Sequence, residues 1–82
     1  MEQIARTSMQ IGTALRRCRR GAGLSQDALA AKTNLRQATI SALENGEAGT
    51  QLRTLIDVMA ALGLEMVIRE RTKSATNVED VF

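Results

Sequence analysis

The 82-residue sequence predicts an all-α protein with four short helices in one domain, followed by a single C-terminal β-strand. Apolar residues recur at spacings of three and four over most of the chain, as in helices that bury one face. Capping residues and glycines divide this pattern into short segments. After Gly63 the period changes to two, which is typical of a strand. A chain of this length can bury one core but not two.

The first two helices are expected over residues 8–20 and from Ser25 to about residue 32. Thr7 and Gln10 stand at the spacing of a capping box before the first helix, which "GAG" ends. Ser25 is a preferred N-cap residue for the second helix, and Asp27 in its first turn meets the positive end of the helix dipole. Residues 33–35 should form a tight turn, because Asn34 tolerates a left-handed conformation.

The third and fourth helices are expected over residues 36–44 and 51–62. Asn45 and Gly46 end the third helix, Thr50 is placed to cap the fourth, and Gly63 ends it. Residues 1–7 then remain as a flexible N-terminal arm, and residues 72–82 as a polar, disordered tail. The helical domain is thus expected over residues 8–63.

Residues 64–71 are the expected strand, in which Leu64, Met66 and Ile68 alternate with other residues. A lone strand exposes unpaired amides and carbonyls, so we expect it to pair with its own copy across a two-fold axis and to cover the helices with the alternating apolar side chains. Alternatively, this segment extends the fourth helix or lies irregularly on the core. The expected dimerisation residues are Leu64, Met66, Val67 and Ile68.

Composition limits the chemistry that the chain can perform. It has no His and one cysteine, Cys18, which removes most zinc sites, His-based catalysis and any intrachain disulfide. No clustered carboxylates or phosphate-binding glycine loop are present, so we expect no enzyme, metal or cofactor. The longest apolar segment is broken by Asp57 and Glu65, and the N-terminus does not resemble a signal peptide. A cytoplasmic location without membrane contact is therefore predicted.

Positive charge is concentrated in the N-terminal half of the chain. Residues 6–36 contain seven cations and one anion, a net charge of +6, whereas the whole chain carries +2. Such a distribution favours a polyanionic partner, although single arginines are more often solvated. Each of Arg16, Arg17 and Arg20 is compatible with contacts to phosphate, to a partner or to water.

The expected third helix has a polar face with no partner in the chain. It buries Ile40 and Leu43 and otherwise carries polar or small residues, so it is a weak packing element. The major groove of B-DNA admits one helix and presents groups that such side chains can read. The alternative is a solvated helix in a small bundle. Its polar, mostly outward residues are Arg36, Gln37, Thr39 and Ser41, and its small residues are Ala38 and Ala42. Ser25 and Gln26, at the start of the preceding helix, are placed to bind phosphate.

Residues 24–46, "LSQDALAAKTNLRQATISALENG", resemble the helix-turn-helix of the lambda-repressor and Cro (XRE) family, and the likeness extends over about residues 11–63. It implies a four-helix lambda-repressor-like DNA-binding domain that recognises a palindromic operator as a homodimer. It also implies phosphate or positioning contacts by Gln26 and Asn45 and a structural ion pair between Arg19 and Glu44. The base-facing positions that it implies are Gln37, Ala38 and Ala42, with Arg36, Thr39 and Ser41 beside them. Asn34 departs from the usual turn glycine, and Arg36 stands where Ser or Thr usually caps the helix.

The ending of the chain resembles HipB-type antitoxins in particular, because a strand and a polar tail follow the fourth helix and the recognition helix contains "QATIS". This resemblance implies a repressor of its own operon that holds a HipA-like Ser/Thr kinase toxin. Phe82 is either an aromatic anchor on that partner or a frayed end. Two alternatives remain: a free-standing phage-like or restriction-controller repressor, and a protein-interaction module that does not bind DNA.

Overall fold

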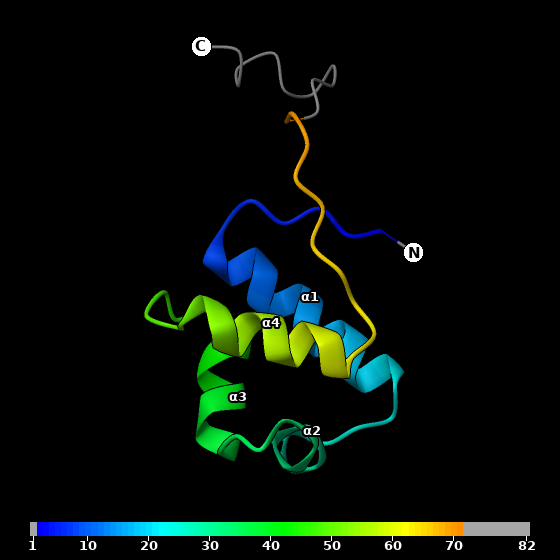
Figure 1. Cartoon of the computed structure of the whole chain (residues 1–82), viewed down its shortest axis with the longest axis vertical. Coiled ribbons are helices and arrows are strands. Elements are labelled where there is room, and N and C mark those ends of the chain that lie inside the picture. Colours follow the sequence, from blue (N-terminus) through cyan, green and yellow to red (C-terminus); the bar gives the residue numbers. More distant parts are fainter. Residues whose placement is uncertain (1, 72–82) are drawn as a thin grey trace.

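The regular structure of the computed structural model, which describes residues 2–71, consists of four α-helices. α4 lies across α1, and α2 and α3 lie together at one end of the molecule (Figure 1). The all-helical prediction is confirmed, and the helix ends differ from those expected by at most one residue. The observed bounds are α1 Ser8–Gly21, α2 Gln26–Thr33, α3 Gln37–Glu44 and α4 Leu52–Ala61.

Side-chain caps begin the first two helices as the sequence predicts. The Thr7 hydroxyl accepts from the Gln10 amide at 3.1 Å, and the Ser25 hydroxyl accepts from the Ala28 amide at 3.0 Å. The prediction that Thr50 caps α4 is wrong. Gln51 holds the N-cap position without a side-chain hydrogen bond, while the Thr50 hydroxyl donates to the Glu47 carbonyl at 3.3 Å and closes the preceding loop.

One residue with a positive φ follows each helix, and at α2 this residue is not a glycine. Asn34 has φ 57° and ψ 36°, and the Leu35 amide donates back to the Ala30 carbonyl at 2.9 Å. This is the left-handed helix ending in which the next apolar residue folds back onto the helix. The predicted role of Asn34 in the turn is thereby confirmed, and the turn directs the chain from α2 into α3.

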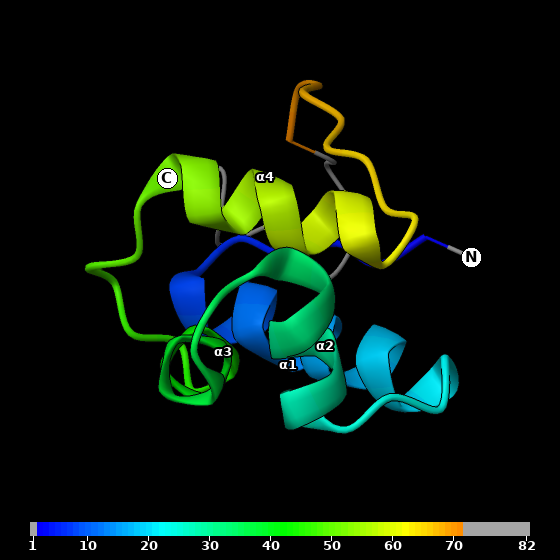
Figure 2. The same ribbon diagram turned by 60° about the horizontal axis from the view of Figure 1, so that its bottom comes forward.

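All four helices contribute to one aliphatic core. Ile40, Leu29 and Val58 are the largest fully buried side chains, and Figure 2 shows α4 above the other helices, with α2 in front of α1 and beside α3. Ile40 anchors the inner face of α3, because it lies wholly inside this core at 0 % exposure. The buried apolar residues are Leu15, Leu29, Ala30, Ile40, Leu43 and Val58.

Gly12 allows the backbone of α1 to contact the backbone at the C-terminal end of α3 directly. A Cβ atom on Gly12 would lie 2.5 Å from the Glu44 carbonyl oxygen and 2.6 Å from that of Leu43. No side chain fits in this space, so the contact requires glycine. This role of Gly12 was not among the predictions from the sequence, although a glycine inside a predicted helix is itself a signal of close packing.

Residues 64–71 form no strand in the described part of the single chain. They run away from the helices, near the N-terminal arm (Figure 1). The expectation that Leu64, Met66 and Ile68 all cover the helices needs correction for the single chain: only Leu64 packs against the core, whereas Met66 is 53 % and Ile68 93 % exposed. A strand requires a partner for its amides and carbonyls, and residues 2–71 of one chain offer none. The predicted tail, with Phe82, lies outside the described residues.

No helix within residues 2–71 is both long enough and apolar enough to span a bilayer.

Candidate nucleic-acid interface

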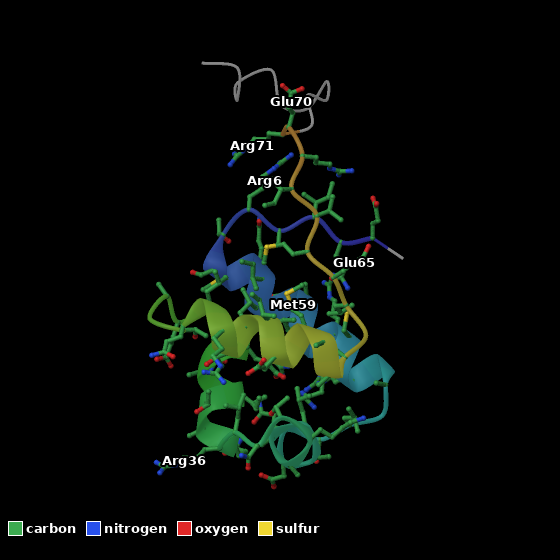
Figure 3. The ribbon with its side chains drawn as sticks, viewed as in Figure 1. Arg6, Arg36, Met59, Glu65, Glu70 and Arg71 are labelled. Atoms are coloured by element: carbon green, nitrogen blue, oxygen red, sulfur yellow. The ribbon has the colours of Figure 1, made fainter. Side chains whose placement is uncertain are left out.

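α3 has one buried face and one exposed face. Ile40 and Leu43 point into the core, while Gln37 and Ala38 are exposed on the opposite side. Arg36, the N-cap residue, extends away from the body of the molecule at its far tip (Figure 3). The remaining residues expected to face bases are half-buried beside this exposed face: Thr39, Ser41 and Ala42.

A buried ion pair holds the C-terminal end of α3 against α1. Arg19 donates from Nε to the Glu44 Oε2 atom at 2.6 Å and from Nη2 to Oε1 at 3.0 Å, and each residue is only 7 % exposed. Arg19 also donates from Nη1 to the Leu24 carbonyl at 2.7 Å. The structure thus brings together the two residues that the family resemblance pairs, and ties them to the loop that leads into α2.

The pKa of Glu44 reflects two opposing effects. Burial raises this pKa, but the hydrogen bonds from Arg19 and Gln26 and the positive charges of Arg19 and Arg16 leave it below its ordinary value. The hydrogen bond to Glu44 raises the pKa of Arg19 further above its already high value. Both side chains are therefore charged at neutral pH, and both oxygens of the Glu44 carboxylate accept hydrogen bonds from Arg19.

Gln26 joins this pair to the exposed face of α3. Its Nε2 atom donates to the Glu44 Oε1 atom at 3.1 Å, and its Oε1 atom accepts from the Nε2 atom of Gln37. One side chain at the start of α2 therefore contacts both ends of α3. The family resemblance implies phosphate binding or positioning for Gln26, and the contacts of this side chain within the chain are of the positioning kind.

Gln37 keeps hydrogen-bonding capacity that the described part of the chain does not use. Its amide donates one hydrogen to Gln26, and within residues 2–71 its Oε1 atom has no partner. A glutamine with a free carbonyl oxygen and a second amide hydrogen can hydrogen-bond an adenine edge. The hydrogen bond to Gln26 fixes the orientation of the side chain before any ligand arrives.

Ser25 precedes α2 and Asn45 follows α3, and the residues next to them, Gln26 and Glu44, are hydrogen-bonded to each other. Ser25 is exposed at the N-terminus of α2, where its hydroxyl oxygen caps the helix and its hydroxyl hydrogen remains available. Asn45 is exposed as the C-cap of α3. Neither side chain is occupied in a way that prevents contact with a phosphate beside α3.

A short helix with an exposed polar face, held from behind by a buried ion pair and crossed by a second helix at its N-terminal end, defines a DNA-binding helix-turn-helix regulator. Residues 15–68 match the model of the helix-turn-helix family HTH_3, and the chain belongs to this family, which is of the XRE type. This family is regulatory rather than enzymatic. No curated protein matches the chain.

Solved structures of HipB are similar to this chain over most of its length. A complex of a HipB variant with an O2 20mer is 30 % identical, with a TM-score of 0.81 over 88 % of this chain and 100 % of that one. A HipA–HipB–O2–O3 complex gives 31 % identity and a TM-score of 0.79 over 87 % of this chain and 100 % of that one. A HipB–O4 20mer complex is 31 % identical, with a TM-score of 0.80 over 87 % of this chain and 100 % of that one.

Proposed function

We propose that the chain is a sequence-specific DNA-binding repressor whose α3 lies in the major groove. The observation that carries this proposal is the exposed polar face of α3, whose first residue, Gln37, is already oriented by Gln26. Small residues on the same face allow close approach to base edges. In this function the base-facing residues are Arg36, Gln37, Ala38, Thr39, Ser41 and Ala42. Ser25 and Asn45 contact phosphate, and Gln26, which positions α3, contacts phosphate through its second amide hydrogen.

The repressor acts as a homodimer joined through residues 64–71. Met66, Val67 and Ile68 are consecutive, apolar and at least half exposed, and their backbone has no strand partner within residues 2–71. Proteins rarely leave such an edge open, because it pairs readily with another chain. A two-stranded sheet between copies covers these side chains and leaves α3 of both copies uncovered.

The regulator further functions as a HipB-like antitoxin that represses its own operon and neutralises a HipA-like Ser/Thr kinase toxin. This part of the proposal is supported by the similarity to HipB structures over 87 to 88 % of the chain. One of those HipB structures is a complex with HipA. The alternative is a free-standing repressor with the same DNA-binding unit and no toxin.

Selection from a randomised duplex library tests the DNA-binding function. The protein should enrich a palindrome whose half-sites are separated by about one or two helical turns. Its affinity for that duplex should fall steeply with salt, because cations that neutralise phosphates release counterions. Failure to retard any duplex at low salt would contradict the proposal and favour a protein-interaction module.

Purification of the tagged protein from its native host tests the antitoxin function. A companion with kinase activity, recovered in stoichiometric amount and inactive until released, is the expected result. The Gln37→Ala variant serves as a matched control, because it should lose selective DNA binding and still recover the kinase. Recovery of the protein without a companion contradicts the antitoxin function and favours the free-standing repressor.

A further inference from the structure

α1 carries three exposed arginines, Arg16, Arg17 and Arg20, which have the same charge but cannot have the same surroundings. Successive residues of an α-helix point about 100° apart. The ion pairs within residues 2–71 are Arg19 with Glu44 and Arg69 with Glu2, so none of the three exposed arginines has a carboxylate within ion-pair distance in this part of the chain.

Two contacts show which face of α1 meets the end of α3. Gly12 lies directly against the backbone carbonyls of Leu43 and Glu44, and Arg19 pairs with the Glu44 carboxylate. Arg16 is four residues after Gly12 and three before Arg19, and these spacings place side chains on the same side of a helix. Arg16 therefore lies at the edge of the contact between α1 and the C-terminal end of α3.

Arg17 faces another part of the molecule. It lines a shallow hollow together with Gln3 and Ile4 of the N-terminal arm and with Met9 and Thr13 of α1. The arm runs near residues 64–71, at the end of the molecule opposite to α2 and α3 (Figure 1). Arg16 and Arg17 thus lie on different surfaces, one beside the end of α3 and the other beside the N-terminal arm.

The Glu44 carboxylate does not neutralise Arg16. Both of its oxygens accept hydrogen bonds from Arg19, and Oε1 also accepts one from Gln26. One carboxylate therefore faces two guanidinium groups, and the corner formed by α1 and the end of α3 keeps one uncompensated positive charge. Arg16 is the exposed member of this cluster.

We infer that Arg16 binds a DNA backbone phosphate beside the C-terminal end of α3, so that α1 takes part in the interface together with α2 and α3. This inference rests on the proposed function, since it requires α3 to lie in the groove. Arg16 then fixes the position of the domain on the duplex without reading sequence, because phosphate contacts carry no base information.

The test compares Arg16→Ala, Arg17→Ala and Arg16→Lys in the full chain. All three replace an exposed side chain of the same helix, at Arg16 beside the end of α3 or at Arg17 beside the N-terminal arm. Affinity is measured against salt concentration, on a duplex selected by the wild-type protein and on a scrambled duplex. Far-UV circular dichroism verifies that each variant retains its helices.

Arg16→Ala should weaken binding to both duplexes roughly 3- to 10-fold per protomer near 0.1 M salt and reduce the salt slope by about 0.9 per protomer. Arg17→Ala should leave affinity and slope unchanged, and Arg16→Lys should retain the wild-type slope. Equal effects of Arg16→Ala and Arg17→Ala, or no change in slope for Arg16→Ala, overturn the inference while the proposed function stands. Wild-type protein that binds no duplex overturns both.

Discussion

At the scale of single residues, the buried pair of Arg19 and Glu44 controls the orientation of α3. Burying two charges costs several kcal/mol of desolvation, so such a pair is poor evidence for stability as such. Here it receives additional hydrogen bonds from Gln26 to Glu44 and from Arg19 to the Leu24 carbonyl. These contacts join α1, α2 and α3 at one point, and the main consequence of the pair is a fixed geometry.

The lowered pKa of Glu44 predicts a specific acid sensitivity. A carboxyl group whose pKa is lower in the folded state stabilises the fold fully above its unfolded pKa of about 4.3. This contribution is lost as the pH falls below that value and through the lower pKa of the folded state. Urea unfolding of the wild-type protein at a series of pH values from neutral downwards should show the loss in this window.

A double variant, Arg19→Met with Glu44→Met, provides the comparison for the acid sensitivity. It removes both charges together and avoids leaving one of them buried alone, which by itself costs about 3–5 kcal/mol. The acid-dependent loss of unfolding free energy below about pH 4.3 should shrink in this variant. Glu47→Gln, at an exposed glutamate, should keep the wild-type profile. An unchanged profile in the double variant contradicts the role given to Glu44.

At the scale of secondary-structure elements, α3 is too short to be stable alone. It has eight residues, and isolated helices of this length are marginal in water. Its stability comes from burial of Ile40 and Leu43 and from its close approach to α1 at Gly12. The exposed face contributes little to packing, so its residues are free to serve recognition.

Alanine substitution should affect the stability of the fold differently at two glycines of α1. Gly12→Ala places a Cβ atom 2.5 Å from the Glu44 carbonyl oxygen and should destabilise the fold by about 1–3 kcal/mol, because the backbone of α3 must move. Gly21→Ala meets no atom within 4 Å and should be neutral or stabilising by up to about 1 kcal/mol. Thermal unfolding of both variants checks this, and a stabilised Gly12→Ala variant contradicts the packing described for α1 and α3.

The helices and their ends could be predicted from the sequence because the signals are local. Thr7, Ser25 and Asn34 act within one turn of their own positions, and each does in the structure what its residue type predicts. Thr50 failed as a cap because a second local interaction, with the Glu47 carbonyl, competed for its hydroxyl. The local sequence is compatible with Thr50 either as a helix cap or as a donor to Glu47, and it does not show which interaction is stronger.

The long-range part of the candidate site could be predicted only where the family resemblance supplied it. Periodicity alone does not pair Arg19 with Glu44, which are 25 residues apart. The contacts of Gln26 with both ends of α3, and the fit of Gly12 against α3, depend on how the helices meet in space. The strand proposed for residues 64–71 needs a second chain for its hydrogen bonds, so a single chain does not test it.

At the scale of the whole molecule, the two proposed surfaces lie at opposite ends. Arg36 marks the tip formed by α2 and α3, whereas Arg6 and Arg71 lie at the other end, near the segment 64–71 (Figure 3). A dimer formed through that segment keeps both copies of α3 accessible. Two linked half-site contacts then supply affinity that one small module does not reach.

Truncation after Glu65 tests the proposed dimer. It removes Met66, Val67 and Ile68 but keeps Leu64, which packs against the core and whose amide closes α4 on the Met59 carbonyl at 2.8 Å. The truncated protein should be a folded monomer with much weaker binding to a palindromic duplex. Sedimentation shows its mass, and circular dichroism its helix content. A truncated protein that remains dimeric contradicts dimerisation through residues 64–71.

The ratio of affinities for a selected and a scrambled duplex, measured for wild-type protein and for Gln37→Ala, tests most directly whether the exposed face of α3 reads bases. Removal of a base-contacting glutamine should cost about 1–3 kcal/mol on the selected duplex and little on the scrambled one, so the ratio should fall. A ratio that stays at the wild-type value in Gln37→Ala would contradict the assignment of this face to base recognition.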